Sequence, residues 1–245
     1  MSVSDDLQLL QLMKLVSPAL PVGAFAYSQG LEGAIEQQWL TDINEEQRPE
    51  EAAQHWISGV LHQNIVKLDL PALFWQLDSL EKEECSSFNE FNELIFAMRE
   101  TSELRLESQQ MGAALLKLLR DTEQELEPKL KKLLFDSELS AYQAKIDWVS
   151  AFAIACKSGN ISSKQALLGY GWAWCETQVA AAIKLVPLGQ TQGQKILNQL
   201  INELAKLIEE LLKSMPDKNN IGAISPNLAI ISSLHEQQYS RLFRS

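Results

Sequence analysis

The sequence has 245 residues, of which 46% are hydrophobic and 22% are charged, and its formal net charge is −11. We expect a single domain over residues 1–245, because this length is sufficient for one buried core. A strongly acidic chain lacks the basic surface with which proteins neutralise phosphates, so nucleic acid is not expected as a partner. No apolar run approaches the roughly twenty residues that cross a bilayer, which indicates a protein without a membrane segment.

The first residues, MSVSDDLQLLQLMKL, carry acid where a secretion signal carries basic side chains. We therefore expect a cytoplasmic protein. The three cysteines, Cys85, Cys156 and Cys175, are far apart and odd in number, which argues against a disulfide framework and against a paired-thiol metal site. At least two of them are predicted to be small buried apolar residues.

Residues 17–32, SPALPVGAFAYSQGLE, are the first unusual segment along the chain. Two prolines fix an extended backbone and Gly23 permits a turn, so that Phe25 and Tyr27 come just before a helix start. Phe25 has no polar end and is predicted to pack in the core. Tyr27 has two open interpretations, core packing or partner recognition, because its hydroxyl can form a hydrogen bond at a surface.

Most of the remaining chain shows helical periodicity. Apolar residues recur every three or four positions and no run alternates polar with apolar residues, which predicts an all-α fold, a single-domain bundle of about ten helices. Proline marks two breaks: Arg48 and Pro49 come before a helix predicted over His55–Asn64, and Pro71 lies in the first turn of a helix that runs to about Leu80. Capping boxes predict four more starts: Thr122 with Glu125, Ser140 with Gln143, Ser162 with Gln165, and Thr191 with Gln194.

Residues 162–184 are predicted to form the central helix, because apolar side chains cover much of its circumference. Gly169 and Gly171 each cost about 1 kcal/mol of helix propensity relative to alanine, which indicates close approach by a neighbouring helix. Residues 111–114, another small-residue patch, predict a similar tight contact.

Groups that could carry catalysis are scarce. The chain has no G-x-x-x-x-G-K-[ST] loop, so phosphate binding is not expected. His235 and Glu236 begin a pattern like H-E-x-x-H, but Tyr239 stands where the second zinc-binding histidine belongs. His55 and His62 leave a weak metal-binding alternative to ordinary polar positions on a helix. We expect no catalytic residue, no metal site and no cofactor.

An acidic ridge, formed by Glu100, Glu103 and Glu107, lies beside two arginines. The spacing of Arg99 and Glu103 predicts a surface ion pair on one helix face. Considered alone, such a ridge indicates a solvated helix face.

The last part of the chain combines a linker with a helix. Residues 215–225, MPDKNNIGAIS, are rich in turn-forming residues and predict a flexible linker. Ser225 can cap a helix that has Pro226 at its first position. An apolar stripe is predicted to dock this helix on the body of the protein: Leu228, Ile231, and Leu234 or His235.

Beyond this helix the residue types change. Tyr and Arg dominate binding energy at protein interfaces, and the segment contains Tyr239, Arg241, Phe243 and Arg244. The segment therefore predicts partner binding, although a frayed terminus remains the alternative. If it folds back over residues 17–32, Tyr27 could meet Arg241 or Arg244.

Four blocks of the sequence form a pattern that covers about its whole length. They are SPALPVGAFAYSQGLEGAIE, RETSELRLESQQMGAALLKLL, AAIKLVPLGQTQGQKIL and LAIISSLHEQQYSRLFRS. In content and in order these blocks resemble the urease accessory protein F family. Such a match is far more specific than one short motif.

The resemblance implies a helical homodimer that acts as a chaperone rather than as an enzyme. It implies assistance to nickel insertion into apo-urease, with this protein bridging accessory protein D/H, a scaffold, and accessory protein G, a GTPase. It also implies that the partner binds GTP, which agrees with the missing phosphate loop, and it raises the expectation that the acidic ridge faces a partner. We expect these partner-binding residues: Tyr27, Glu32, His235, Glu236, Tyr239, Ser240, Arg241, Leu242, Phe243 and Arg244.

Two alternatives remain open. The first is a helical adaptor that regulates a GTPase through a terminal arginine acting in trans. The second is a metal-dependent hydrolase, whose metal and catalytic groups would be His235, Glu236, His55 and His62.

Overall fold

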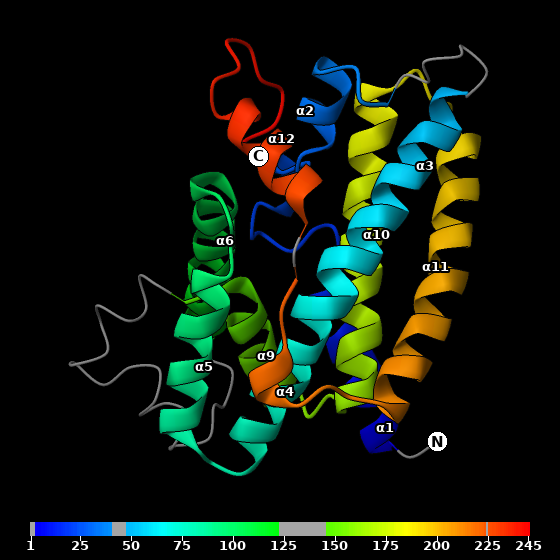
Figure 1. Ribbon diagram of the computed structural model, residues 1–245. Helices are drawn as coiled ribbons and strands as arrows, with labels where there is room; N and C mark the ends of the chain where they lie inside the picture. The colour runs from blue at the N-terminus through cyan, green and yellow to red at the C-terminus, as the bar shows by residue number, and fades with distance from the viewer. Residues whose placement is uncertain (1–2, 41–47, 123–145, 224) are drawn as a thin grey trace.

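The computed structural model describes residues 3–40, 48–122, 146–223 and 225–245. Within these ranges every regular element is a helix and no strand occurs, so the predicted all-α fold is confirmed (Figure 1). The capping pair at Ser140 and the Glu125 side chain lie outside the described residues. None of the helices described is long and apolar enough to span a bilayer.

The helices follow the chain in a simple order. The first half contains α1 (Val3–Leu15), η1 (Ala24–Ala26), α2 (Leu31–Glu36), α3 (Pro49–Val60), η2 (Leu61–Asp69), α4 (Leu70–Glu81) and α5 (Cys85–Ala97). The second half contains α6 (Ser102–Asp121), α9 (Trp148–Ser158), α10 (Ser163–Leu185), α11 (Gln190–Lys213), η4 (Lys218–Asn220) and α12 (Pro226–His235).

Helix α10 lies in the middle of the bundle and contacts α11, α4, α3, α2 and α1 (Figure 1). A Cβ added at Gly169 would lie 2.5 Å from the side chain of Leu12 in α1, and one at Gly171 would lie 2.6 Å from Leu204 in α11. Gly112 in α6 meets the main chain before α9 in the same way, at 2.6 Å. The predicted close approaches are therefore confirmed, and they let α10 serve as the central packing surface.

The chain from α3 to α4 is one continuous helical run with a π-helical middle, η2. The run starts at Pro49, six residues before the predicted start at His55, and continues past Asn64; Pro71 lies in the first turn of α4, as predicted, but no break precedes it. The i→i+5 pattern widens the turn locally. Asp69, at the end of η2, is consequently buried in the centre of the protein.

The predicted capping boxes have mixed outcomes. Ser162 Oγ accepts from the N–H of Gln165, whose side-chain oxygen accepts in return from the N–H of Ser162, so this box is confirmed. The start predicted at Thr191 is wrong by two residues, because Gly189 precedes α11 and its N–H donates to a glutamine side chain three residues on. Thr122 is the C-cap of α6, and the helix predicted to begin there lies outside the described residues.

Arg99 and Glu103 do not share a helix. Helix α5 ends at Ala97, and α6 begins only after Thr101, whose Oγ1 caps the new helix. Arg99 therefore lies in the link between two helices, where it is buried. The predicted surface ion pair is wrong, because the helix boundary separates residues that sequence spacing places on one face.

The segment of residues 215–225 has two anchors on the body of the protein. The Trp75 indole Nε1 donates to the main-chain oxygen of Pro216 at 2.9 Å, and Ile221 is buried in the core. The predicted flexibility of this segment stays a prediction.

Helix α12 begins at Pro226, as predicted, although the side chain of Ser225 does not cap it. Its buried stripe consists of Leu228, Ile231 and His235. Leu234, the alternative to His235, is exposed. The stripe packs against α2 and α6, so α12 brings the end of the chain over the start of α6 (Figure 1).

Candidate functional site

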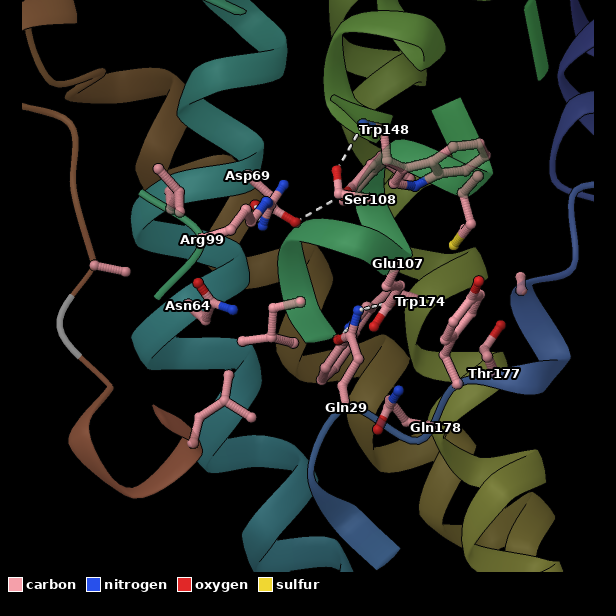
Figure 2. A pocket seen from close by; sticks show the side chains of 18 of the residues that line it. Gln29, Asn64, Asp69, Arg99, Glu107, Ser108, Trp148, Trp174, Thr177 and Gln178 are labelled. Atoms are coloured by element: carbon pink, nitrogen blue, oxygen red, sulfur yellow. Dashed lines mark hydrogen bonds and ion pairs between the residues drawn. The ribbon is translucent and has the colours of Figure 1, made fainter. Parts of the chain in front are cut away.

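A cavity of about 80 Å³, lined by both apolar and polar side chains, lies between η2, α6 and α10, next to residues 24–29 (Figure 2). A space of this size holds several water molecules. Its polar lining comes from elements far apart in the chain and includes Gln29, Asn64, Asp69, Arg99, Glu107 and Gln178.

Arg99 forms a buried ion network on one wall of this cavity. Its Nη1 donates to Asp69 at 2.8 Å, and its Nε and Nη2 donate to Asp147 at 3.0 and 3.2 Å. Tyr170 donates to Asp69 and Ser108 donates to Asp147, each at 2.6 Å. Burial raises the pKa of Asp69, with Arg99 opposing that shift. Burial alone would lower the pKa of Arg99, but the two aspartates hold it well above its ordinary value.

Glu107 separates the cavity from the end of the chain. One carboxylate oxygen accepts from Gln29 Nε2 and the other from Ser245 Oγ, both at 2.6 Å. The Trp174 indole holds the amide oxygen of Gln29, also at 2.6 Å, and Figure 2 shows these three side chains meeting. Burial raises the pKa of Glu107 to about 7, although the hydrogen bonds from Ser245 and Gln29 lower it.

The two aromatic residues of segment 17–32 differ in burial, and Phe25 does not lie where it was expected. Gly23 adopts a left-handed backbone with φ of 81°, and residues 24–26 form a short 3₁₀ turn that leaves Phe25 38% exposed. Phe25 was predicted in the core, so this prediction is wrong. Tyr27 is buried, its hydroxyl donates to Gln110 Oε1 at 2.8 Å, and burial raises its pKa.

Glu32 holds the C-terminal tail, which we define as residues 236–245. Its two carboxylate oxygens accept from the main-chain N–H groups of Leu242 and Phe243 at 2.7 and 2.8 Å. The ring of Phe243 is 5% exposed and lies 5.6 Å from the ammonium of Lys184 in α10. The tail is therefore fixed by its backbone and by one buried aromatic ring.

His235 joins two carboxylates beneath the tail. Its Nδ1 lies 2.9 Å from Glu103 and its Nε2 lies 3.3 Å from Glu32, with the side chain fully buried. Arg241 donates to the second oxygen of Glu103 at 2.6 Å. One end of α6, one end of α12 and the tail thus meet in a single charged cluster.

The last two residues of the tail lie on segment 17–32. The N–H and Oγ of Ser28 both donate to the main-chain oxygen of Ser245, at 2.8 and 2.7 Å. The N–H of Arg244 donates to the main-chain oxygen of Ala26 at 2.7 Å. The Arg244 guanidinium lies 3.4 Å from Gln110 Oε1, which also accepts from Tyr27. The tail thus folds back over segment 17–32, and of the two arginines considered as contacts of Tyr27 it is Arg244 that lies beside it.

The predicted partner-binding residues divide into two groups by exposure. The buried group is Tyr27, Glu32, His235 and Phe243. The exposed group is Glu236, Tyr239, Ser240, Arg241, Leu242 and Arg244. Glu236 also accepts from Ser102 Oγ and from the N–H of Glu103, which fastens the end of α12 to α6. In this conformation the buried four hold the tail and the exposed six face outward; their contact with a partner stays a prediction.

Nucleophilic and metal-binding groups are sparse in the part of the chain that the structure describes. There, no three His, Cys, Asp or Glu side chains gather in a way that could hold a metal ion. His62 bonds Glu203 at 2.6 Å rather than approaching His55. Cys156 and Cys175 are buried, as predicted, and burial raises the pKa of Cys175 to about 12. These thiols are therefore packing residues.

Comparison with known proteins gives the family. A model of the UreF family matches residues 48–201. The chain belongs to the UreF family. A urease accessory protein UreF from Marinomonas sp. (strain MWYL1) is 40% identical over 243 residues, covering 99% of this chain and 96% of the relative. Another from Teredinibacter turnerae is 41% identical over 238 residues, covering 97% and 99%. Membership of the UreF family gives the chain a role in urease maturation, and these relatives are named accessory proteins rather than enzymes.

Sequence reasoning missed part of the site in this UreF-family chain. Glu103, Glu107 and Gln110 lie on one face of α6, at spacings of four and three, and together they receive the tail. The acidic ridge was a signal for two of them, because its spacing follows one helix face. Nothing in the sequence shows that the chain's own tail would cover this face.

Proposed function

We propose that this UreF-family chain is a non-catalytic, cytoplasmic homodimer that bridges accessory protein D/H and the GTPase accessory protein G during nickel insertion into apo-urease. In this proposal the docked tail and segment 17–32 form one contact surface. The buried residues keep the tail in place, and the exposed residues meet the partner.

The observation that carries the proposal is the way in which the tail is held. Glu32 accepts two consecutive main-chain N–H groups, at Leu242 and Phe243, so this part of the tail has a fixed conformation. A fixed tail presents its outward side chains, including Tyr239, with less conformational entropy to lose on binding. Exposed apolar side chains of nearby helices extend this surface: Leu106 in α6, and Ile230 and Leu234 in α12.

Removing residues 242–245 should abolish the complex with the partners while leaving the helical fold intact. The deletion removes the Phe243 ring and both N–H groups that bind Glu32, so the rest of the tail keeps only the bonds of Arg241 and Glu236 to α6. We would measure the complex by co-expression with accessory proteins D/H and G, size-exclusion chromatography and mass measurement, and the fold by circular dichroism. The control is Glu210→Gln on α11, which lies across α10 from α6 (Figure 1). An intact three-protein complex with the truncated chain would contradict the proposal.

One observation favours regulation of the GTPase as a second candidate function. Arg241 is neutralised by Glu103, whereas the exposed guanidinium of Arg244 lies near two neutral groups, the Gln110 amide and the Tyr27 hydroxyl. An arginine supplied in trans speeds GTP hydrolysis by about 10³–10⁵-fold. If the chain regulates the GTPase in this way, Arg244→Ala should remove that acceleration in a single-turnover assay, and Arg244→Lys should not restore it. Equal hydrolysis rates by accessory protein G with and without this chain would exclude it.

A further inference from the structure

The charged cluster beneath the tail has an unusual proton requirement. Both ring nitrogens of His235 face carboxylate oxygens, Glu103 on one side and Glu32 on the other. An ionised carboxylate only accepts hydrogen bonds, and a neutral imidazole has a single N–H. With neutral His235, one of the two contacts would therefore set a nitrogen lone pair against a carboxylate oxygen.

The charges around the cluster also favour a protonated His235. Three carboxylates receive the tail and α12: Glu32 from α2, and Glu103 and Glu107 from α6. The one guanidinium bonded directly to any of them is that of Arg241, among the described residues. The other titratable groups at this face are Glu236, which accepts from Ser102 and from the N–H of Glu103, and Tyr27, Arg244 and Lys184, which contact Gln110 or the Phe243 ring. A second positive charge at the cluster would come from His235.

We propose that the C-terminal tail is a proton-dependent latch, closed when His235 carries both ring protons and loosened when it loses one. Protonated His235 donates to Glu32 and Glu103 at once, and Glu32 in turn holds the two main-chain N–H groups of the tail. Loss of one proton removes the donor from one carboxylate, beside an imidazole that is fully buried. The latch itself does not depend on the proposed function. Only its consequence for partner binding does, because an open tail presents no fixed surface to a partner.

Glu107 responds to pH in the same direction. Its pKa in the closed state is about 7, above its ordinary value, because burial disfavours the charged form. Opening the tail removes the Ser245 hydrogen bond, whose loss raises that pKa, but it also admits water, and because burial is the larger cause the pKa falls. A group whose pKa is higher in the closed state stabilises that state at low pH, and this stabilisation is lost as the pH rises toward about 7. His235 and Glu107 therefore both favour closure in mild acid and opening in mild base.

The test follows the tail in the isolated full-length chain by nuclear magnetic resonance between pH 5.5 and 8.5 at constant ionic strength. The amide signals of Leu242 and Phe243 report their bonds to Glu32. We expect these signals to move toward unbonded positions as the pH rises, with the closed-to-open ratio falling by up to about tenfold per pH unit for each proton released. Wild-type signals that stay in place over this range would overturn the proposal.

Variants assign the effect to the cluster. Glu107→Gln should remove the part of the transition near pH 7, and His235→Gln should remove the remaining dependence, whereas the surface control Glu210→Gln should titrate like the wild type. If His235→Gln does not fold, the ring carbon and proton shifts of His235 in the wild type decide, and an imidazole that stays neutral at pH 5.5 overturns the latch. Because no partner is present, failure of this test is distinct from failure of the bridging function.

Discussion

Replacing Arg99 with methionine should destabilise the protein by about 3–5 kcal/mol, the cost of removing one partner from a buried ion network. Methionine fills much of the same space but leaves Asp69 and Asp147 without their shared cation. These two aspartates come from η2 and from the residue that caps α9, so the guanidinium joins elements that meet only in the folded protein. Urea unfolding followed by circular dichroism gives the free energy of unfolding.

The same variant should have a pH dependence of known sign. Burial already raises the pKa of Asp69, and removal of Arg99 takes away the charge that opposes this shift. An acid with a raised pKa in the folded state stabilises the fold below its unfolded pKa, and this contribution is lost as the pH rises through the folded pKa. The deficit of Arg99→Met should therefore be smaller at pH 5 than at pH 7.5.

A matched control separates the network from arginine loss in general. Arg120→Met changes a half-exposed arginine paired with Asp121 at the end of α6, and it should alter stability by less than about 0.5 kcal/mol. If Arg99→Met and Arg120→Met have equal unfolding free energies at pH 7.5, the buried network does not stabilise this fold.

The helical architecture could be predicted from the sequence because helix signals are local. Apolar periodicity, Pro226 and the Ser162 capping box each act within a few residues, and the structure confirms all three. Gly169 and Gly171 predicted close packing because glycine lowers helix propensity and is expected inside a helix where a neighbouring helix approaches closely. The Arg99 network could not be predicted, because Asp69 and Asp147 lie 30 and 48 residues away from it in sequence.

The sequence predicted which residues belong to the candidate site but not how they are arranged in space. Aromatic and arginine residues in the tail indicated an interface, and Tyr27 indicated where the tail could return. The docking of the tail depends instead on the main-chain N–H groups of Leu242 and Phe243. These groups have no sequence signature, because every residue except proline carries a main-chain N–H. Glu32 could accept both because α2 points its carboxylate at the path of the tail.

The latch and the bridging surface make Glu32 the residue on which the tail most depends. It accepts from two main-chain N–H groups and from His235, whereas Arg241 and Ser245 each add a single side-chain bond to α6. Hydrogen bonds to a charged group contribute about 1.5–3 kcal/mol each, so Glu32 outweighs the other anchors.

Replacing Glu32 with glutamine should therefore release the tail and weaken partner binding by about 10–100-fold, because at least one charged hydrogen bond is lost and each 1.4 kcal/mol is a factor of ten. The amide that replaces one carboxylate oxygen turns a donor toward a tail N–H group, which is repulsive. Hydrogen exchange at the amides of Leu242 and Phe243 measures release, and titration with accessory proteins D/H and G measures binding. Glu210→Gln is the control, since its exposed side chain lies on α11, across α10 from α6. Wild-type exchange rates in Glu32→Gln would show that the tail is held by other contacts, and wild-type affinity with a released tail would show that its fixed conformation has no part in binding.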